Sequence, residues 1–313
     1  MNYWVFLSAD YWASLCASIR VYKVCAKAHQ IMAGSSYIKR RDKMAIITIS
    51  RGSYSKGKEV AEKVAERLGY ECIAREVLLD ASEHFNIPEI KLVRALHDAP
   101  SVLERFTYGK ERYLTFLESV FLEYVQKDNV VYHGLAGHYF LKGIKHVFKI
   151  RILADIEDRV KWEMERENIS AEEALYILKK DDHERRQWGL RVFGVDTWDP
   201  SLYDMVIHIH KITVDSAVDI ICNAVASEQF KATAESEKAL SDLVLASRVK
   251  AALVSTCPSV RVSAKEGVIF VDTMVGPAVA EPLVQELRSL ANEVQGVKKV
   301  TISVTPTASF FSD

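Results

Sequence analysis

The stretch from Ile46 to Leu68 constrains the fold of this chain more than any other part of it. It opens with the apolar, mostly β-branched run Ile46–Ile49 and passes through a glycine- and serine-containing turn. A helix follows, because apolar residues recur at helical spacing up to Leu68 and Gly69 ends the pattern. The spacing G-x-x-x-x-G-K, which runs from Gly52 to Lys58, indicates phosphate binding when it joins a strand to a helix in this way.

The physical basis of this candidate phosphate loop is its backbone. Glycines allow the chain to wrap an anion, while unpaired N–H groups and the helix dipole favour negative charge. A Ser or Thr that would contact magnesium normally follows the lysine, but Glu59 stands there. The alternative is a glycine-containing turn before an ordinary surface helix. The predicted nucleotide-binding residues are Gly52, Ser53, Tyr54, Ser55, Lys56, Gly57, Lys58 and Glu59.

Composition limits the remaining possibilities. The length of 313 residues suits two domains, and a hydrophobic content of 49% excludes global disorder. There are 41 basic and 42 acidic residues, so no overall positive charge indicates a nucleic-acid partner. Five scattered cysteines without C-x-x-C spacing favour reduced thiols and a cytoplasmic location. His208 and His210 lie on one strand face, but no third ligand is evident, so we predict no protein metal site.

The first 43 residues differ from the rest of the chain. They have weak helical spacing, and the aromatic-rich part is too short for a typical membrane span and contains Asp10. The basic region that precedes the apolar run of a secretory signal is absent. We expect residues 1–43 to be a poorly ordered extension without stable membrane insertion, and the working protein to begin at Met44. A membrane-surface anchor is the alternative.

Residues 44–229 alternate apolar strands with helices. This pattern predicts an α/β domain with a parallel sheet and helices on both faces. Ligands of such sheets bind beyond the carboxyl ends of the strands. The phosphate loop, the Gly134 region and Asp155 are therefore expected on one rim.

A charged run, Lys179–Arg186, follows in a helix that begins after Ser170, and Arg191 lies a little further on. One interpretation is a solvated helix with ion pairs between residues four apart. The other is a cationic lid that closes over phosphates, where arginines neutralise charge during transfer.

The last part of the chain predicts a second domain. Residues 230–240 are small, polar and charged, which favours a linker. Residues 241–305 follow the order helix, strand, strand, helix, strand, a small α+β module. Residues 306–313 are predicted to be a frayed tail.

Two segments of the first domain, Ile47–Tyr70 and Ile169–Ile207, resemble the cytidylate kinase-like family of P-loop nucleoside monophosphate kinases. Lys58-Glu59 fits the loop of that family, and Asp182 to Arg185 matches its Asp-x-x-Arg lid motif. The resemblance implies ATP and Mg²⁺ as cofactors, nucleotides as substrates, and catalytic roles for Lys58, Arg185, Arg186 and Arg191. The chain departs from the family pattern in two places. In the loop, Tyr54 and Lys56 stand where the family usually has more glycine. After the third strand, Leu135 stands where an arginine is common, which concerns the acceptor site.

The C-terminal module resembles a BON domain, most clearly in Gly296-Val297-Lys298-Lys299-Val300. Domains of that family are often associated with envelopes or phospholipid surfaces. Since no signal peptide indicates export, we expect a regulatory role, or a role in homo-oligomer formation or protein binding.

The leading hypothesis is a phosphotransferase that moves the γ-phosphoryl group of ATP to a small acceptor, a nucleoside monophosphate. The alternative is a nucleotide-binding sensor with little turnover that signals through the BON-like module. A third hypothesis is an interaction protein with a vestigial kinase fold. The sequence does not identify the acceptor.

Overall fold

The computed structural model of the chain describes residues 45–74, 76–87, 109–134, 136–275 and 280–306. The predicted extension 1–43, most of the tail 306–313, and Leu135 lie outside these residues. Among the described residues, no helix is both long enough and apolar enough to cross a membrane.

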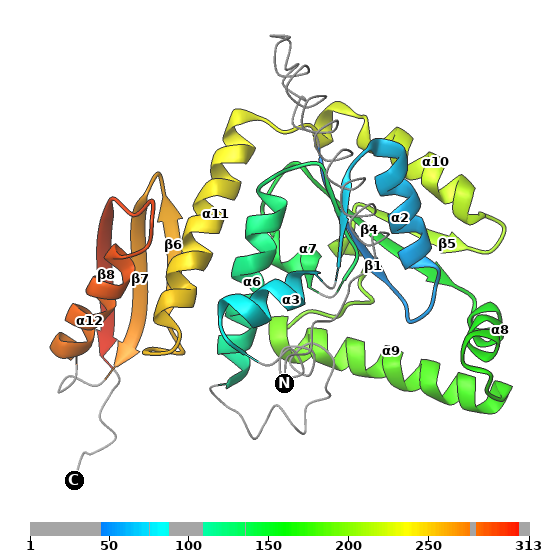
Figure 1. Ribbon diagram of the computed structural model, residues 1–313, viewed down its shortest axis with the longest axis horizontal. Helices are drawn as coiled ribbons and strands as arrows, with labels where there is room; N and C mark the ends of the chain where they lie inside the picture. Colours follow the sequence, from blue (N-terminus) through cyan, green and yellow to red (C-terminus); the bar gives the residue numbers. More distant parts are fainter. Residues whose placement is uncertain (1–44, 75, 88–108, 135, 276–279, 307–313) are drawn as a thin grey trace, which may run out of the picture. The chain divides into compact units, whose positions relative to one another are not determined.

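A five-stranded sheet with the strand order β2-β3-β1-β4-β5 forms the centre of the first part of the chain, and all of its neighbouring strands are parallel (Figure 1). The strands are β1 (Ile46–Arg51), β2 (Glu71–Ile73), β3 (Val130–Tyr132), β4 (Val147–Ala154) and β5 (Met205–Ile209). The helices are α2 (Gly57–Leu68), α3 (Glu76–His84), α6 (Gly109–Val125), α7 (Gly137–Phe140), α8 (Ile156–Glu167), α9 (Ala171–Phe193) and α10 (Val214–Val225). Two short 3₁₀ helices are η1 (Pro200–Leu202) and η2 (Glu228–Phe230).

Helices cover both faces of this sheet. Ile46 of β1 belongs to a core that includes residues of α3, α6 and α7, whereas Ile47 belongs to a second core with residues of α2 and α10. Successive side chains of a strand point to opposite faces, so an uninterrupted apolar strand is what a doubly covered sheet requires. The predicted parallel α/β fold is confirmed. Because the strands are parallel, the loop after β1, Gly134 after β3 and Asp155 after β4 lie at the same rim.

A smaller three-stranded sheet, β6-β7-β8, follows in the C-terminal part. Its elements are α11 (Ala234–Leu253), β6 (Arg261–Lys265), β7 (Val268–Val275), α12 (Ala280–Asn292) and β8 (Lys299–Pro306), in the predicted order. Strands β6 and β7 are antiparallel, and β7 and β8 are parallel.

The predicted linker at 230–240 is wrong over most of its length, since α11 begins at Ala234. Thr233 and Ser236 form a capping box that starts the helix. Leu240 and Val244 of α11 are buried in the core that contains α6, and Val249 and Leu253 are buried in the core of the small sheet. One helix therefore belongs to both cores, because it carries apolar residues for each of them.

Candidate functional site

The phosphate loop has a backbone conformation that usually calls for glycine. Tyr54 has φ 57° and Lys56 has φ 62°, both in the left-handed region. A side chain at such a position costs about 1–2 kcal/mol relative to the right-handed region. The chain therefore accepts backbone strain at two positions of this loop.

The loop connects β1 to α2, so the start of α2 lies at the rim of the sheet. Lys56 is the N-cap residue and makes no side-chain cap hydrogen bond. The first amides of a helix have no partner within the helix, so they are available to an anion. A Cβ atom on Gly57 would lie 2.8 Å from Cβ of Arg51, which explains the glycine at the first turn. Arg51 therefore packs directly against the helix start.

Ser53 connects the loop to two helices. Its carbonyl oxygen accepts a hydrogen bond of 2.7 Å from Nε of Arg159 in α8, and its N–H donates one of 3.0 Å to Asp182 in α9. Arg159 and Asp182 form an ion pair of 2.8 Å. The three residues fix α8 and α9 against the loop.

Helix α8 presents one face to the loop. The guanidinium carbon of Arg166 lies 3.9 Å from the centre of the Tyr54 ring, and Nζ of Lys56 lies 5.0 Å from that of Trp162. Arg159, Trp162 and Arg166 are spaced three and four residues apart, which is the spacing of one helix face. The sequence contains a signal for this face, because the spacing of Arg159, Trp162 and Arg166 can be read from it.

The three arginines predicted to act together are separated in the structure. Arg185 lies three residues after Asp182, and its pKa is lowered by burial and by Arg159, while Asp181 and Asp182 act in the opposite direction. Arg51 packs against Gly57 at the helix start, and its pKa is lowered by burial and by Arg185. Four arginines, Arg51, Arg159, Arg166 and Arg185, thus surround the loop; we call them the loop arginines.

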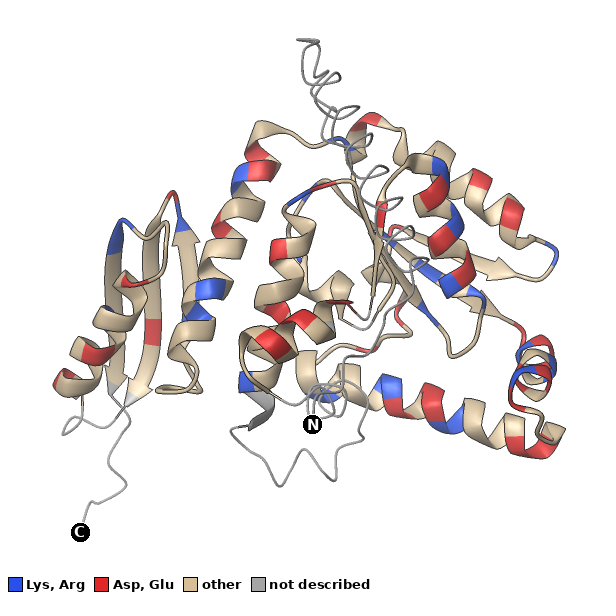
Figure 2. Cartoon of the chain, in the orientation of Figure 1, with Lys and Arg blue, Asp and Glu red and all other residues tan. Residues whose placement is uncertain are grey.

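Arg186 and Arg191 have different surroundings. Arg186 binds Asp196 through Nε and Nη2, at 3.0 and 2.6 Å, and its guanidinium lies 4.5 Å from the ring centre of Trp198. Arg191 is exposed in the last turn of α9. Charged residues are spread along the whole helix (Figure 2), so the solvated-helix interpretation describes part of α9.

Lys58 and Glu59 stand on the outer side of α2. Nζ of Lys58 lies 3.6 Å from Glu62, and 62% of the lysine side chain is exposed. The Glu59 carboxylate lies 3.5 Å from both Lys56 and Lys63. Two lysines therefore neutralise the acidic residue that replaces the usual hydroxyl. Ser55 is buried, and its Oγ donates to the carbonyl oxygens of Gly52 and Ile152 at 3.0 Å.

The rim beside β3 holds a second polar group. His133 follows β3 and is buried, and its pKa is lowered to about 4 by burial and then by the charge of Arg51. Glu76, at the start of α3, accepts a hydrogen bond of 2.7 Å from the N–H of Ala74. Leu135, which follows Gly134, lies outside the described residues.

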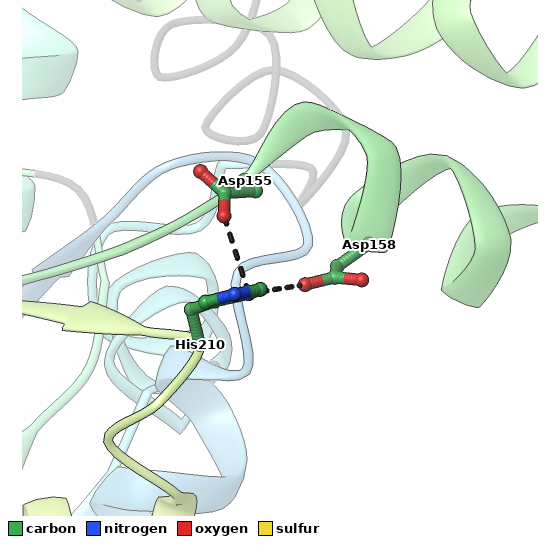
Figure 3. Close-up of side chains that lie close together, drawn as sticks. All are labelled: Asp155, Asp158 and His210. Atoms are coloured by element: carbon green, nitrogen blue, oxygen red, sulfur yellow. Dashed lines mark hydrogen bonds and ion pairs between the residues drawn. The ribbon is translucent and has the colours of Figure 1, made fainter.

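A cluster of histidines and aspartates lies where β4 and β5 end, and Figure 3 shows Asp155, Asp158 and His210 of it. Nδ1 of His210 lies 3.2 Å from Asp155 and 3.2 Å from Asp158, and Nε2 of His208 lies 3.1 Å from Asp155. Sequence analysis predicted no metal site because it found no third ligand near the two histidines. That reason does not hold in the structure, since the chain brings two carboxylates to them.

Comparison of the sequence with models of protein families identifies the family of this chain. The model of the cytidylate kinase-like family matches residues 46–211, more than half of the chain. The chain belongs to the cytidylate kinase-like family. Its α2 loop and its α8 and α9 helices all lie within the matched residues.

Curated relatives show how far the similarity extends. The cytidylate kinase of Sulfolobus acidocaldarius is 24% identical over 58% of this chain and 93% of its own length. The cytidylate kinase of Methanocaldococcus jannaschii is 32% identical over 33% of this chain and 60% of its own length. That of Thermococcus kodakarensis is 32% identical over 28% of this chain and 44% of its own length.

Solved structures with similarity include an uncharacterized protein from Eubacterium ventriosum, with 25% identity, a TM-score of 0.47, and coverage of 58% of this chain and 98% of that chain. Shikimate kinase from Acinetobacter baumannii has 16% identity, a TM-score of 0.34, and coverage of 62% and 99%.

Proposed function

We propose that this chain is an ATP-dependent phosphotransferase that moves the γ-phosphoryl group to a small acceptor, a nucleoside monophosphate. Membership of the cytidylate kinase-like family supports a nucleotide kinase reaction. The observation that carries the proposal is the set of loop arginines around Ser53 and Tyr54. Phosphoryl transfer depends on positioning and on cations that neutralise the charge of the transferred group, and this arrangement provides both.

The nucleotide would bind through the backbone. The amides at the start of α2 would hold the β- and γ-phosphates, and Lys58 would turn from Glu62 to the terminal phosphate. Arg185 would neutralise charge on the transferring group from the side of α9. Helix α9, which Asp182 already holds against the loop, would help to exclude water from the transferring group.

When bound, magnesium would offset the negative charge of the phosphates. The carboxylates described around the loop have cationic or amide partners: Asp182 pairs with Arg159 and Ser53, and Glu59 with Lys56 and Lys63. Magnesium keeps several waters and uses one or two carboxylates together with substrate phosphates. We therefore propose that it arrives with the nucleotide rather than at a preformed protein site.

The decisive experiment is a screen for ADP release with ATP, magnesium and each nucleoside monophosphate in turn. With the acceptor found, Arg185→Ala should lower kcat by about 10²–10³-fold, the usual effect of removing one transition-state donor. Arg186→Ala and Arg191→Ala should have smaller effects, since Arg186 is bound to Asp196. Arg67→Ala is the matched control, because Arg67 pairs with Asp219 on the outer surface. Full turnover of all three α9 variants would mean that α9 is only a solvated helix.

Lys58 has a separate test. Lys58→Ala should weaken ATP binding, and Lys58→Met should do so while keeping the aliphatic part of the side chain. Unchanged ATP affinity in both variants would exclude Lys58 as a phosphate ligand.

The second candidate function is a nucleotide sensor with little turnover. It is favoured by the left-handed Tyr54 and Lys56, which make the loop less adaptable than a glycine loop, and by Glu59. ATP binding by calorimetry without ADP release for any acceptor would support it. Absence of ATP binding would instead favour the interaction protein. In either case the proposed role of the BON-like module is regulation or protein binding, and α11 links it to α6.

A further inference from the structure

The geometry of Asp155, Asp158 and His210 points to a binding site for one divalent transition-metal ion of the zinc type. We propose that these three side chains ligate the ion and that His208 is a positioning residue that orients Asp155. We call these three residues and His208 the rim cluster; Figure 3 shows the three proposed ligands. The proposal concerns the protein without nucleotide and does not depend on the phosphoryl-transfer reaction.

The distances fit a shared ion. One atom from each of Asp155, Asp158 and His210 lies within 4.8 Å of the others. His210 Nδ1 lies 3.2 Å from Oδ2 of Asp155 and 3.2 Å from Oδ2 of Asp158. Ligand atoms bound tetrahedrally to zinc at about 2.0–2.2 Å stand roughly 3.3–3.6 Å apart. Small side-chain adjustments would therefore place all three atoms around one ion.

Nδ1 of His210 faces two carboxylate oxygens at equal distance. A single proton on this nitrogen cannot form a full hydrogen bond to both oxygens. A proton on Nδ1 would have to be shared in a three-centre hydrogen bond. A metal ion binds the nitrogen and both oxygens simultaneously, and an imidazole with two carboxylates is a donor set typical of zinc and related ions.

His208 contributes from the opposite side of Asp155. Its Nε2 lies 3.1 Å from Oδ1, whereas Oδ2 faces His210. Hydrogen bonding to the second oxygen of a ligating carboxylate fixes its orientation, and such partners affect metal affinity strongly. The arrangement uses both oxygens of Asp155 in different roles.

The side chains of the proposed ligands are accessible to solvent, and their net charge suits a cation. Side-chain exposures are 40% for Asp155, 27% for Asp158 and 54% for His210, so an ion can enter from solvent. Lys161 lies 3.6 Å from Asp158, but it approaches Oδ1 rather than Oδ2. The cluster carries two negative charges when the histidines are neutral, and a divalent cation would balance them.

Binding would have a structural consequence. Asp155 and Asp158 lie at the start of α8, and His210 follows β5. The ion would join these elements, and α8 is the helix whose Arg159 contacts Ser53. Metal binding should therefore raise the stability of the α8 region next to the phosphate loop.

The test uses the full chain, freed of metal by a chelator and without nucleotide, titrated with Zn²⁺ by calorimetry and with Co²⁺ by visible absorption. In His210→Ala and in Asp158→Asn, we expect the protein to bind one ion fewer per chain than the wild type, or to bind that ion more than about 10-fold more weakly. His183→Ala is the control, since His183 is an exposed histidine on α9 outside the cluster, and it should bind like the wild type.

The positioning role of His208 has its own readout. His208→Ala should weaken Zn²⁺ binding by about 10–100-fold and change the Co²⁺ spectrum, while His208→Asn, which keeps an N–H donor, should recover part of both. Melting temperatures with chelator present establish that each variant folds. Equal metal affinity and stoichiometry in the wild type, His210→Ala and Asp158→Asn would overturn the proposal and leave the rim cluster as an ion-pair network.

Discussion

The backbone N–H of Ser53 donates a hydrogen bond of 3.0 Å to the carboxylate of Asp182, which lies 129 residues further along the chain. The same carboxylate pairs with Arg159 at 2.8 Å. An amide of the phosphate loop and a guanidinium are the groups that a phosphate would use. In the structure, a carboxylate of α9 occupies them.

Asp182→Asn should tighten ATP binding. The substitution removes a negative charge beside the proposed phosphate site and leaves an amide oxygen that can still accept from Ser53. We expect the Kd for ATP to fall by roughly three- to tenfold, the scale of one unfavourable charge at partial exposure. Calorimetry measures it, with Glu172→Gln, at an exposed position in the first turn of α9, as the control. An unchanged or weakened affinity would show that Asp182 does not oppose the nucleotide.

Glu59→Ala should leave ATP affinity unchanged or slightly tighter, with and without magnesium. The Glu59 carboxylate lies between Lys56 and Lys63, each at 3.5 Å, so it has cationic partners other than a nucleotide-bound ion. Glu66→Ala, on the exposed face of the same helix, is the control. A large loss of affinity seen only with magnesium would mean that Glu59 stands in for the missing hydroxyl as a metal ligand.

Lowering the pH should reduce the stability of the folded protein, in part through the titration of His133. Burial, followed by Arg51, lowers its pKa from 6.5 to about 4 in the folded state, so the unfolded chain binds a proton first as the pH falls. The contribution of His133 to stability is therefore present above about pH 6.5 and is lost as the pH falls toward about 4. The slope is about 1.4 kcal/mol per pH unit within this window.

Denaturant unfolding at several pH values measures that slope. His133→Gln should reduce it, because glutamine does not titrate. His138, whose pKa is lowered to about 3 by burial and nearby cations, contributes in the same direction, so the slope should not vanish. Equal slopes for the wild type and His133→Gln would contradict the assignment.

Helix α11 should stabilise the kinase-like part of the chain. Leu240 is 3% exposed in the core that contains α6, so Leu240→Ala should cost about 2–5 kcal/mol. Met274→Ala, at a side chain 57% exposed on β7, should change stability by less than about 0.5 kcal/mol. A chain that ends at residue 229 should melt at a lower temperature than the full chain. Equal melting temperatures would mean that the predicted boundary at 229 separates independent units.

The sequence alone predicted the order of the elements and several of their ends. The helix predicted to run to Leu68 and to stop at Gly69 ends there in the structure, because caps and hydrophobic periodicity are local signals. The phosphate loop was also predictable, since its spacing lies within one short segment. Residues 234–240 were predicted incorrectly as a linker, because composition favoured a loop while the capping of α11 and the burial of Leu240 decided for a helix.

Tertiary structure decided which side chains surround each site. The parallel sheet places Asp155 at the ligand-binding rim, as expected, but the arrival of His210, 52 residues away from Asp158, depends on how β5 is paired with β4. Likewise, Arg185 lies near the loop and Arg186 does not, although they are adjacent. The rotation of a helix about its own axis is set by packing against the rest of the chain, and no local pattern contains that information.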